Sequence, residues 1–129
     1  MVERTAERAV VKQWRDVLAC HAVVSSALEH ELGEKHGLGV SEFEVLERLA
    51  EGPADCEGLR VQELADDVHL SQSALSRLIG RLESAGLVVR AICAADRRGI
   101  FVNLTDAGRE RYLAARPTHR AVLKASLPH

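Results

Sequence analysis

Residues 70–84 read LSQSALSRLIGRLES, and this segment carries the signals of one amphipathic helix. Ser71 is a residue type that caps helix N-termini, and Leu70 and Leu75 have the spacing of a hydrophobic staple. The sequence therefore predicts a helix from Ser71 to Ala85, followed by Gly86, which suits the left-handed position after a helix. At about 100° per residue its apolar residues fall in one narrow stripe, formed by Leu75, Leu78, Ile79 and Leu82.

The opposite face of this helix carries small and basic residues and no acidic one. Small residues let a helix approach the major groove of DNA closely, and arginine can bind guanine or phosphate. Gln72 and Ser73 lie in the first turn, where backbone N–H groups and the helix dipole also favour a phosphate. For this segment taken alone, a solvated polar face on an ordinary core helix is an equal alternative. The face consists of Ser73, Ser76, Arg77, Gly80, Arg81 and Ser84.

The preceding segment makes DNA binding the better interpretation. Residues 60–68 predict a short helix with Leu64 and Ala65 facing inward, and His69-Leu70 connects it to the capped helix. Two helices joined by such a short turn, the second with basic and hydroxyl residues outward, are typical of a helix-turn-helix.

The following segments predict a β-hairpin. Residues 87–93 and 100–104 are rich in residues that favour strands, and residues 94–99 join them. Gly99 permits a tight return, and an arginine at such a tip, here Arg98, can enter a narrow minor groove. Asp96 has the spacing to pair with Arg98 and hold the shape of the loop.

The N-terminal region predicts a long helix that extends beyond its own domain. From about Glu7 to Glu34, apolar residues recur at intervals of three and four, and Gly37 follows. Such a helix spans about 42 Å, whereas a compact domain of this length has a radius of gyration of about 14 Å. Part of its apolar face therefore needs a second chain. The face consists of Val10, Val11, Trp14, Val17, Leu18, Val24, Leu28 and Leu32.

Two further helices are predicted. The run Ser41-Glu42-Phe43-Glu44 has the form of a capping box, so a helix is expected to begin at Ser41 and to end at Gly52-Pro53. Residues 53–59 are expected to form a surface loop. Thr105-Asp106 caps a final helix, which Pro117 is expected to kink or interrupt.

Composition and charge narrow the function. The chain of 129 residues is the size of one domain. Residues 1–70 carry 7 Lys or Arg and 15 Asp or Glu, whereas residues 71–129 carry 10 Lys or Arg and 4 Asp or Glu. The second half is therefore net positive and suits a polyanionic partner. A membrane span and a signal peptide are not expected. Three scattered cysteines fit a reducing cytoplasm, and 4 aromatic residues argue against single-stranded nucleic acid as the main ligand.

Five short segments resemble the MarR family of winged helix-turn-helix regulators. The resemblance runs from the long first helix to about Arg116, and the Asp-x-Arg-Gly wing in register is a specific part of it. The segments are 61–65 (VQELA), 70–83 (LSQSALSRLIGRLE), 86–88 (GLV), 96–99 (DRRG) and 104–109 (LTDAGR).

This resemblance implies a cytoplasmic bacterial homodimer that binds pseudo-palindromic operators in double-stranded DNA. Such proteins usually repress, and they release DNA when a small, often phenolic, ligand or an oxidant acts near the junction of the dimer and DNA-binding regions. Arg98 would enter the minor groove, Arg97 would add affinity for the backbone, and Asp96 would support the wing. After the cap Ser71, the match places groove contacts at Gln72, Ser73, Ser76, Arg77 and Arg81.

The expected fold is mainly α with a small β-hairpin wing, a winged helix-turn-helix with long N-terminal and C-terminal dimerisation helices. Residues 1–129 form one domain, with a dimerisation helix (1–36), a DNA-binding core (41–104) and a C-terminal helical segment (105–129). Family members usually finish with a further helix that embraces the partner's first helix, and here the sequence ends shortly after its proline. We therefore expect the dimer to rely on the first helix and the segment after Thr105.

The effector is less well defined by the sequence. Cys20, beside His21, lies where one branch of the family keeps a peroxide-sensing cysteine, so redox sensing is an alternative, although its apolar neighbours favour ordinary packing. Four residues could line an organic-ligand pocket at the dimer junction, and core packing explains the apolar ones equally well: Trp14, Val17, His21 and Phe43.

Other classes of function have weaker support. The histidines show no i, i+4 pair, and His30 and His36 are six apart, so no metal site is expected. No nucleophile, phosphate-loop or HExxH motif is present, so catalysis and a cofactor are not expected. A winged helix that binds protein and never DNA would tolerate acidic residues on the exposed helix face, where none occurs.

Overall fold

The protein is described by a computed structural model, which covers residues 2–52, 59–91 and 100–128. The described chain is mainly helical, with a three-stranded antiparallel sheet in the strand order β1-β3-β2. The expected fold class, mainly α with a small hairpin, is confirmed. In chain order the elements are α1 (Val2–His36), α2 (Val40–Glu51), β1 (Leu59–Arg60), α3 (Val61–Val68), α4 (Gln72–Ser84), β2 (Val88–Ala91), β3 (Phe101–Leu104) and α5 (Asp106–Ser126).

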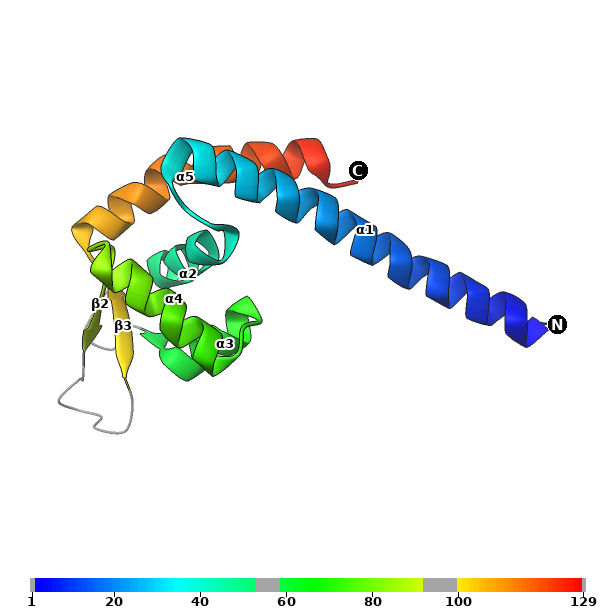
Figure 1. The fold of residues 1–129 in the computed structure, drawn as a ribbon, viewed down its shortest axis with the longest axis horizontal. Coiled ribbons are helices and arrows are strands. Elements are labelled where there is room, and N and C mark those ends of the chain that lie inside the picture. Colours follow the sequence, from blue (N-terminus) through cyan, green and yellow to red (C-terminus); the bar gives the residue numbers. More distant parts are fainter. Residues whose placement is uncertain (1, 53–58, 92–99, 129) are drawn as a thin grey trace.

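One hydrophobic core joins these elements. Helices α2, α3 and α4 pack with the sheet into a small body, and α5 passes over α2 and runs alongside α1 (Figure 1). The apolar stripe expected on α4 is buried. Core side chains come from α1, the α1–α2 connection, α2, α3, α4, β2, β3 and α5. The largest fully buried ones are Phe43, Leu32, Leu38, Leu46, Leu64, Leu75, Ile79, Leu82, Val45, Val88 and Val102.

Helix α1 extends far beyond this core. Its 35 residues correspond to about 52 Å, and its N-terminal half projects away from the body (Figure 1). Within this chain, Val24, Leu28 and Leu32 are buried, whereas the apolar residues before them are exposed. The expectation that this helix overhangs its own domain is confirmed. Within the ranges that the structure describes, no helix combines the length and the apolar character that crossing a membrane requires.

Three of the predicted helix ends are confirmed. Ser71 Oγ accepts a hydrogen bond from Ala74 N at 3.2 Å, and Thr105 Oγ1 accepts one from Gly108 N at 3.0 Å. Gly86 follows α4 with a φ of 79°, a conformation that glycine adopts without strain. Local side-chain chemistry therefore determines where α4 and α5 begin.

The predicted start of α2 is wrong by two residues. Gly39 is the N-cap residue, and Glu42 Oε1 accepts a hydrogen bond from Gly39 N at 2.8 Å. Glu29, from α1, accepts a second one from Val40 N at 2.9 Å. Two carboxylates therefore accept hydrogen bonds from the N–H groups of Gly39 and Val40, and α1 supplies one of them.

The sheet and α5 also differ from expectation. Arg60 was expected to begin a helix and Leu59 to end a loop, but Leu59–Arg60 form strand β1, which pairs with Val102 and Phe101 of β3. Helix α5 continues through Pro117, so the proline does not interrupt the helix, and a kink there stays a prediction. The helix can continue because its apolar residues keep packing against α1 and α2 beyond the proline.

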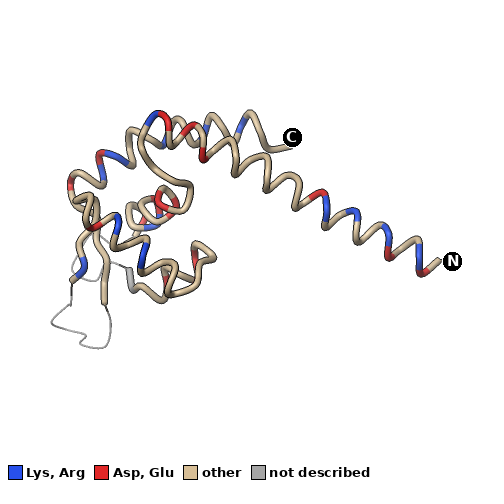
Figure 2. Tube along the Cα trace, in the orientation of Figure 1, with Lys and Arg blue, Asp and Glu red and all other residues tan. Residues whose placement is uncertain are grey.

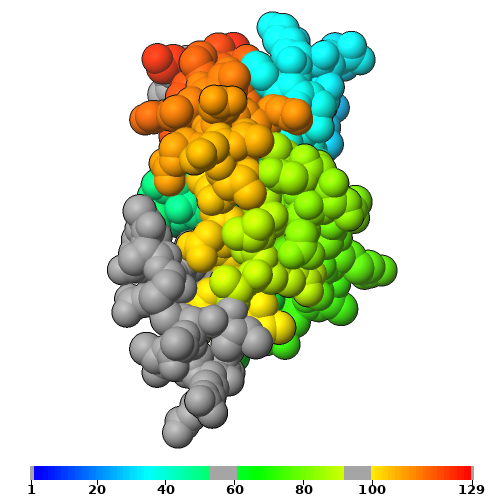
Figure 3. All heavy atoms as spheres, turned by 90° about the vertical axis from the view of Figure 1, so that its left-hand side faces the viewer, coloured from blue at the N-terminus to red at the C-terminus, as the bar shows by residue number. Residues whose placement is uncertain are grey.

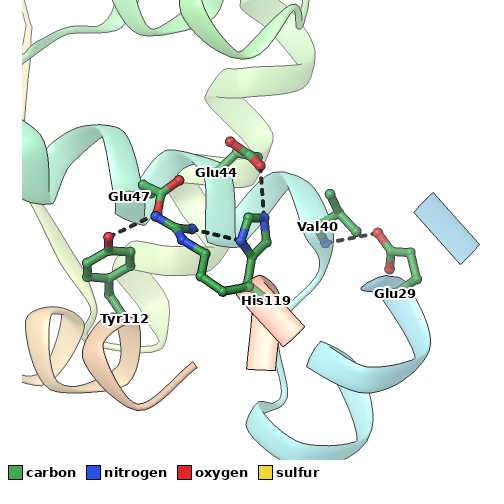
Figure 4. A network of polar contacts seen from close by, with 7 residues as sticks. Glu29, Val40, Glu44, Glu47, Tyr112 and His119 are labelled. Atoms are coloured by element: carbon green, nitrogen blue, oxygen red, sulfur yellow. Dashed lines mark hydrogen bonds and ion pairs between the residues drawn. The ribbon is translucent and has the colours of Figure 1, made fainter. Parts of the chain in front are cut away.

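A polar network ties α5 to α2 inside the core (Figure 4). Arg120 donates to Glu47 Oε2 at 2.7 Å and to His119 Nδ1 at 2.8 Å, and Tyr112 donates to the same Glu47 oxygen at 2.9 Å. Because a guanidinium only donates, His119 carries its ring proton on Nε2, which lies 3.5 Å from Glu44 Oε1. The His119 ring also stacks on Phe43 at 4.3 Å between ring centroids.

This network predicts a loss of stability in acid. Burial by itself raises the pKa of Glu47, but hydrogen bonds from Arg120 and Tyr112 and the charge of Arg120 outweigh it, so the pKa lies below the usual 4.5. The ionised Glu47 therefore stabilises the fold above about pH 4.5, and this contribution is lost as the pH falls through the lowered pKa. We expect the melting temperature of Glu47→Gln to fall less than that of the unsubstituted protein between about pH 5 and pH 3. Equally steep losses would contradict this role of Glu47.

Candidate nucleic-acid interface

Helix α4 presents its predicted binding face to solvent. The residues on that face are exposed, and none between Gln72 and Arg81 is acidic, as the two blue segments on α4 show (Figure 2). Ser71 Oγ lies 3.3 Å from Ser73 Oγ, so the cap and the first turn form one hydroxyl-rich end. The face offers hydrogen-bond donors and small side chains to a groove. Its exposed residues are Ser71, Gln72, Ser73, Ser76, Arg77 and Arg81.

Strand β2 contacts one side of α4 through the side chain of Arg90. Its guanidinium donates to the carbonyl oxygen of Ser76 at 3.0 Å and lies 3.8 Å from a carboxylate oxygen of Glu83. The guanidinium passes beside Gly80, where a Cβ would make an ordinary contact of 4.0 Å with Arg90 Nη2. The sequence alone could not pair Arg90 with Ser76, because Arg90 lies on β2 and Ser76 lies on α4. Arg90 therefore orients α4 relative to the hairpin.

The other side of α4 is open. A hollow of about 290 Å³ lies there, between α4 and the first turn of α2. Among the described residues, neither arginine that borders it forms an ion pair. The hollow is lined by Ser41, Leu70, Ala74, Arg77, Leu78 and Arg81.

The turn between α3 and α4 is backbone-strained. His69 has a φ of 59°, a left-handed conformation that is uncommon outside glycine. Leu70 N donates to Ala65 O at 3.1 Å across it. The expected helix-turn-helix is therefore present, and its turn contains a left-handed residue that the sequence did not single out.

The hairpin base is fixed against α5. Thr105 Oγ1 donates to Gly86 O at 2.6 Å, and Thr105 N donates to Leu87 O at 3.1 Å. Seen from the hairpin side, the first turns of α5 (orange) lie directly against the yellow-green surface of α4 and β2 (Figure 3). The two strands and α4 therefore keep one orientation relative to the long helices.

The predicted wing tip lies outside the described residues. Residues 92–99 are not described, so Asp96, Arg97 and Arg98 have no observed position. Strands β2 and β3 pair in register up to Ala91 and Phe101. The role of the three residues stays a prediction.

The proposed ligand residues are not brought together in one protomer. Trp14 and Val17 are exposed on the projecting part of α1, and His21 is exposed with Ser25 Oγ 3.3 Å from its Nε2. Phe43 is fully buried beside Tyr112 and His119, so it lines no open pocket in this chain. The sequence grouped them at the junction between two copies, and this single protomer shows only that α1 carries two of them away from the core, so the grouping stays a prediction.

Cys20, the candidate redox residue, packs against the core and is only partly exposed to solvent. Cys20 is half-buried against the hydrophobic core, where α1 enters the body. Among the described residues, no three His, Cys, Asp or Glu side chains are grouped as a metal site would require. The other two cysteines, Cys56 and Cys93, lie outside the described residues.

Two helices joined by a tight turn, followed by a hairpin, define a winged helix-turn-helix. A sequence profile described as the MarR family matches residues 36–99. AbsC, a MarR family transcriptional regulator from Streptomyces coelicolor, is 35% identical with a TM-score of 0.81, and the match covers 89% of this chain and 76% of AbsC. The chain belongs to the MarR family.

Two further solved structures are similar. Sco3205, a MarR family regulator of Streptomyces coelicolor in complex with DNA, is 32% identical with a TM-score of 0.83, over 95% of this chain and 74% of Sco3205. CouR of Rhodococcus jostii RHA1, bound to p-coumaroyl-CoA, is 28% identical with a TM-score of 0.73. The match covers 82% of this chain and 71% of CouR. A curated transcriptional regulator of Bacillus subtilis, YkoM, is 31% identical over 97 residues, which are 73% of this chain and 60% of YkoM. The chain thus spans less than two thirds of that relative.

Proposed function

We propose that the protein is a transcriptional regulator that binds a specific site in double-stranded DNA through α4. The observation that carries this proposal is the exposed face of α4, which has hydroxyls, two arginines that form no ion pair with another described residue, and no acidic residue. A helix of this kind in a winged helix-turn-helix fits the major groove. The DNA-bound structure of Sco3205, which shares the fold, supports the same role.

The active form proposed here is a cytoplasmic homodimer. The apolar face of α1 extends from its buried part at Val24 into its exposed part at Val17 and Trp14, and a second copy would cover the exposed part. Two α4 helices related by a two-fold axis would contact half-sites about 10 bp apart, so the operator would be pseudo-palindromic. Repression by occupying a promoter is the mode of action proposed for this dimer.

An organic effector is proposed to release the DNA. CouR, with bound p-coumaroyl-CoA, supports an aromatic, phenol-derived ligand for this chain. Because Phe43 is buried, the ligand would need the junction that forms when a second copy covers Trp14 and Val17. Oxidation of Cys20 is the alternative, and its partial burial disfavours it. Equal peroxide-induced DNA release by the unsubstituted protein and Cys20→Ser would exclude the oxidation.

Substituting single arginines tests the proposed binding mode. We expect Arg77→Ala to weaken binding to a selected operator by about 1–3 kcal/mol and to change the base preference at one position of each half-site. Arg98→Ala is expected to weaken binding to many sequences alike, because a minor-groove contact depends on shape and charge. Arg116→Ala removes an exposed arginine from α5 and serves as the control. Unchanged affinity for Arg77→Ala and Arg98→Ala at physiological salt would contradict the proposal.

A further inference from the structure

The hollow beside α4 has an unusual set of polar groups. Its lining includes one hydroxyl, from Ser41, and two guanidinium groups, from Arg77 and Arg81, and no carboxylate. Guanidinium groups only donate hydrogen bonds, and a hydroxyl can donate one. A lining of donors with positive charge fits an anion that accepts several hydrogen bonds, such as a phosphate diester.

Ser41 is available for such a contact because it is not the helix cap. The N–H groups of Gly39 and Val40 are satisfied by Glu42 and Glu29. Neither carboxylate lines the hollow, and Ser41 is half-buried at its edge. Among the described residues, the Ser41 side chain makes no hydrogen bond, so its hydroxyl can bind a ligand without loosening α2.

The position of Arg81 on α4 favours a DNA phosphate over a base. Measured from the buried Leu75, Ser73 lies at about 160° and Arg77 at about 200° around the helix, so these two are at the centre of the exposed face. Arg81 lies at about 240°, turned toward the hollow. When a helix lies in the major groove, the centre of its outer face meets the bases, and its sides meet the two phosphate backbones.

The opposite side of α4 offers a weaker site for a phosphate. There the guanidinium of Arg90 is engaged by the carbonyl oxygen of Ser76 and lies near the carboxylate of Glu83. The hollow is therefore the side where α4 and α2 can hold the DNA backbone.

We propose that Ser41 and Arg81 together bind one backbone phosphate of the operator in each half-site, while Arg77 and Ser73 face the bases. This inference rests on the proposed function, because the phosphate belongs to the DNA that α4 enters. It assigns Ser41 to the DNA interface and makes Arg81 a residue that positions α4 in the groove rather than one that selects the sequence.

Salt titrations on two duplexes test this assignment. The duplexes are one that the full-length protein selects from a random pool and an unrelated one of equal length. We expect Arg81→Ala to weaken both by a similar factor, at least tenfold at low salt, and to reduce the salt slope by about one. Ser41→Ala is expected to weaken both by about tenfold, and Ser41→Thr, which keeps the hydroxyl, to restore binding. Arg116→Ala and Ser126→Ala are the matched controls on α5.

Neutral methylphosphonate linkages then locate the contact. At one phosphate in each half-site, neutralisation should weaken binding of the unsubstituted protein but cause little further loss for Ser41→Ala or Arg81→Ala. A base-specific effect of Arg81→Ala with an unchanged salt slope would overturn the assignment, as would unchanged affinity for Ser41→Ala. Failure of the unsubstituted protein to bind either duplex at low salt would instead refute the proposed function itself. Circular dichroism melting confirms that each variant is folded.

Discussion

Trp14→Asp is expected to make the protein monomeric at micromolar concentration and to lower its affinity for operator DNA at least a hundredfold. Trp14 is 59% exposed in the protomer, and Val10 and Val17, which share its helix face, are 65% and 55% exposed. The same face is buried further along α1, at Val24, Leu28 and Leu32, which shows that the pattern suits a packed surface. A buried interface tryptophan contributes about 2 kcal/mol or more, and in a symmetric dimer each substitution acts twice.

The loss of DNA affinity follows from the loss of the dimer. A dimer binds two half-sites at once, whereas a monomer binds one, so the second half-site no longer contributes. Ala9→Asp is the matched control, because Ala9 is exposed about 140° around the helix from Trp14 and gains the same charge. Sedimentation equilibrium gives the mass, and fluorescence anisotropy gives the affinity. A Trp14→Asp protein that remains dimeric would contradict the assignment of this face to a second copy.

Gly108→Ala is expected to lower the free energy of unfolding by about 3 kcal/mol or more. A Cβ at Gly108 would overlap the carbonyl oxygen of Leu87, lie 2.9 Å from its carbonyl carbon and lie 3.1 Å from Leu104 Cδ2. The first contact is with backbone, so a side-chain rotation cannot relieve it. Moving α5 away would break the hydrogen bonds of Thr105 to Gly86 and Leu87. Overpacking at a fixed backbone junction is strongly destabilising.

A second glycine provides the control. A Cβ at Gly33, inside α1, would meet no atom within 4 Å, so Gly33→Ala should stabilise the helix by about 0.5–1 kcal/mol. Thermal melting of the two variants is expected to give shifts of opposite sign. Because the same junction holds α4 against the hairpin, Gly108→Ala should also weaken DNA binding below its melting temperature. Equal melting temperatures for the two variants would show that the junction tolerates a methyl group.

Local rules predicted the elements whose causes are local. Ser71 and Thr105 cap the helices that follow them, and the apolar stripe of α4 is buried as its spacing predicts. The start of α2 could not be predicted in this way, because one of its two carboxylate partners, Glu29, is eleven residues away on α1. The two-residue strand β1 is too short to give an alternation signal, and it forms because β3 offers a free edge.

In the candidate site, too, the features with local causes were predicted and those that arise from contacts between elements were not. The exposed face of α4 follows from its helical period, so the residues exposed on it could be named from the sequence. Arg90 and Ser41 were missed as parts of the site, because their relation to α4 arises from packing of β2 and α2 against it. Trp14 and Phe43 are not brought together within one protomer, so their grouping at the dimer junction stays a prediction.

The most direct test of sequence-specific DNA binding is a selection of DNA by the protein from a pool of random duplexes. We expect the selection to enrich an inverted repeat whose half-site centres lie about 10 bp apart. Two copies of the chain should bind this repeat with an affinity that depends steeply on salt. We also expect Arg77→Ala to select a repeat that is altered at one position in each half. A pool that shows no enriched sequence after repeated rounds, with no binding above that of unrelated DNA, would contradict the central claim that this protein is a sequence-specific DNA-binding regulator.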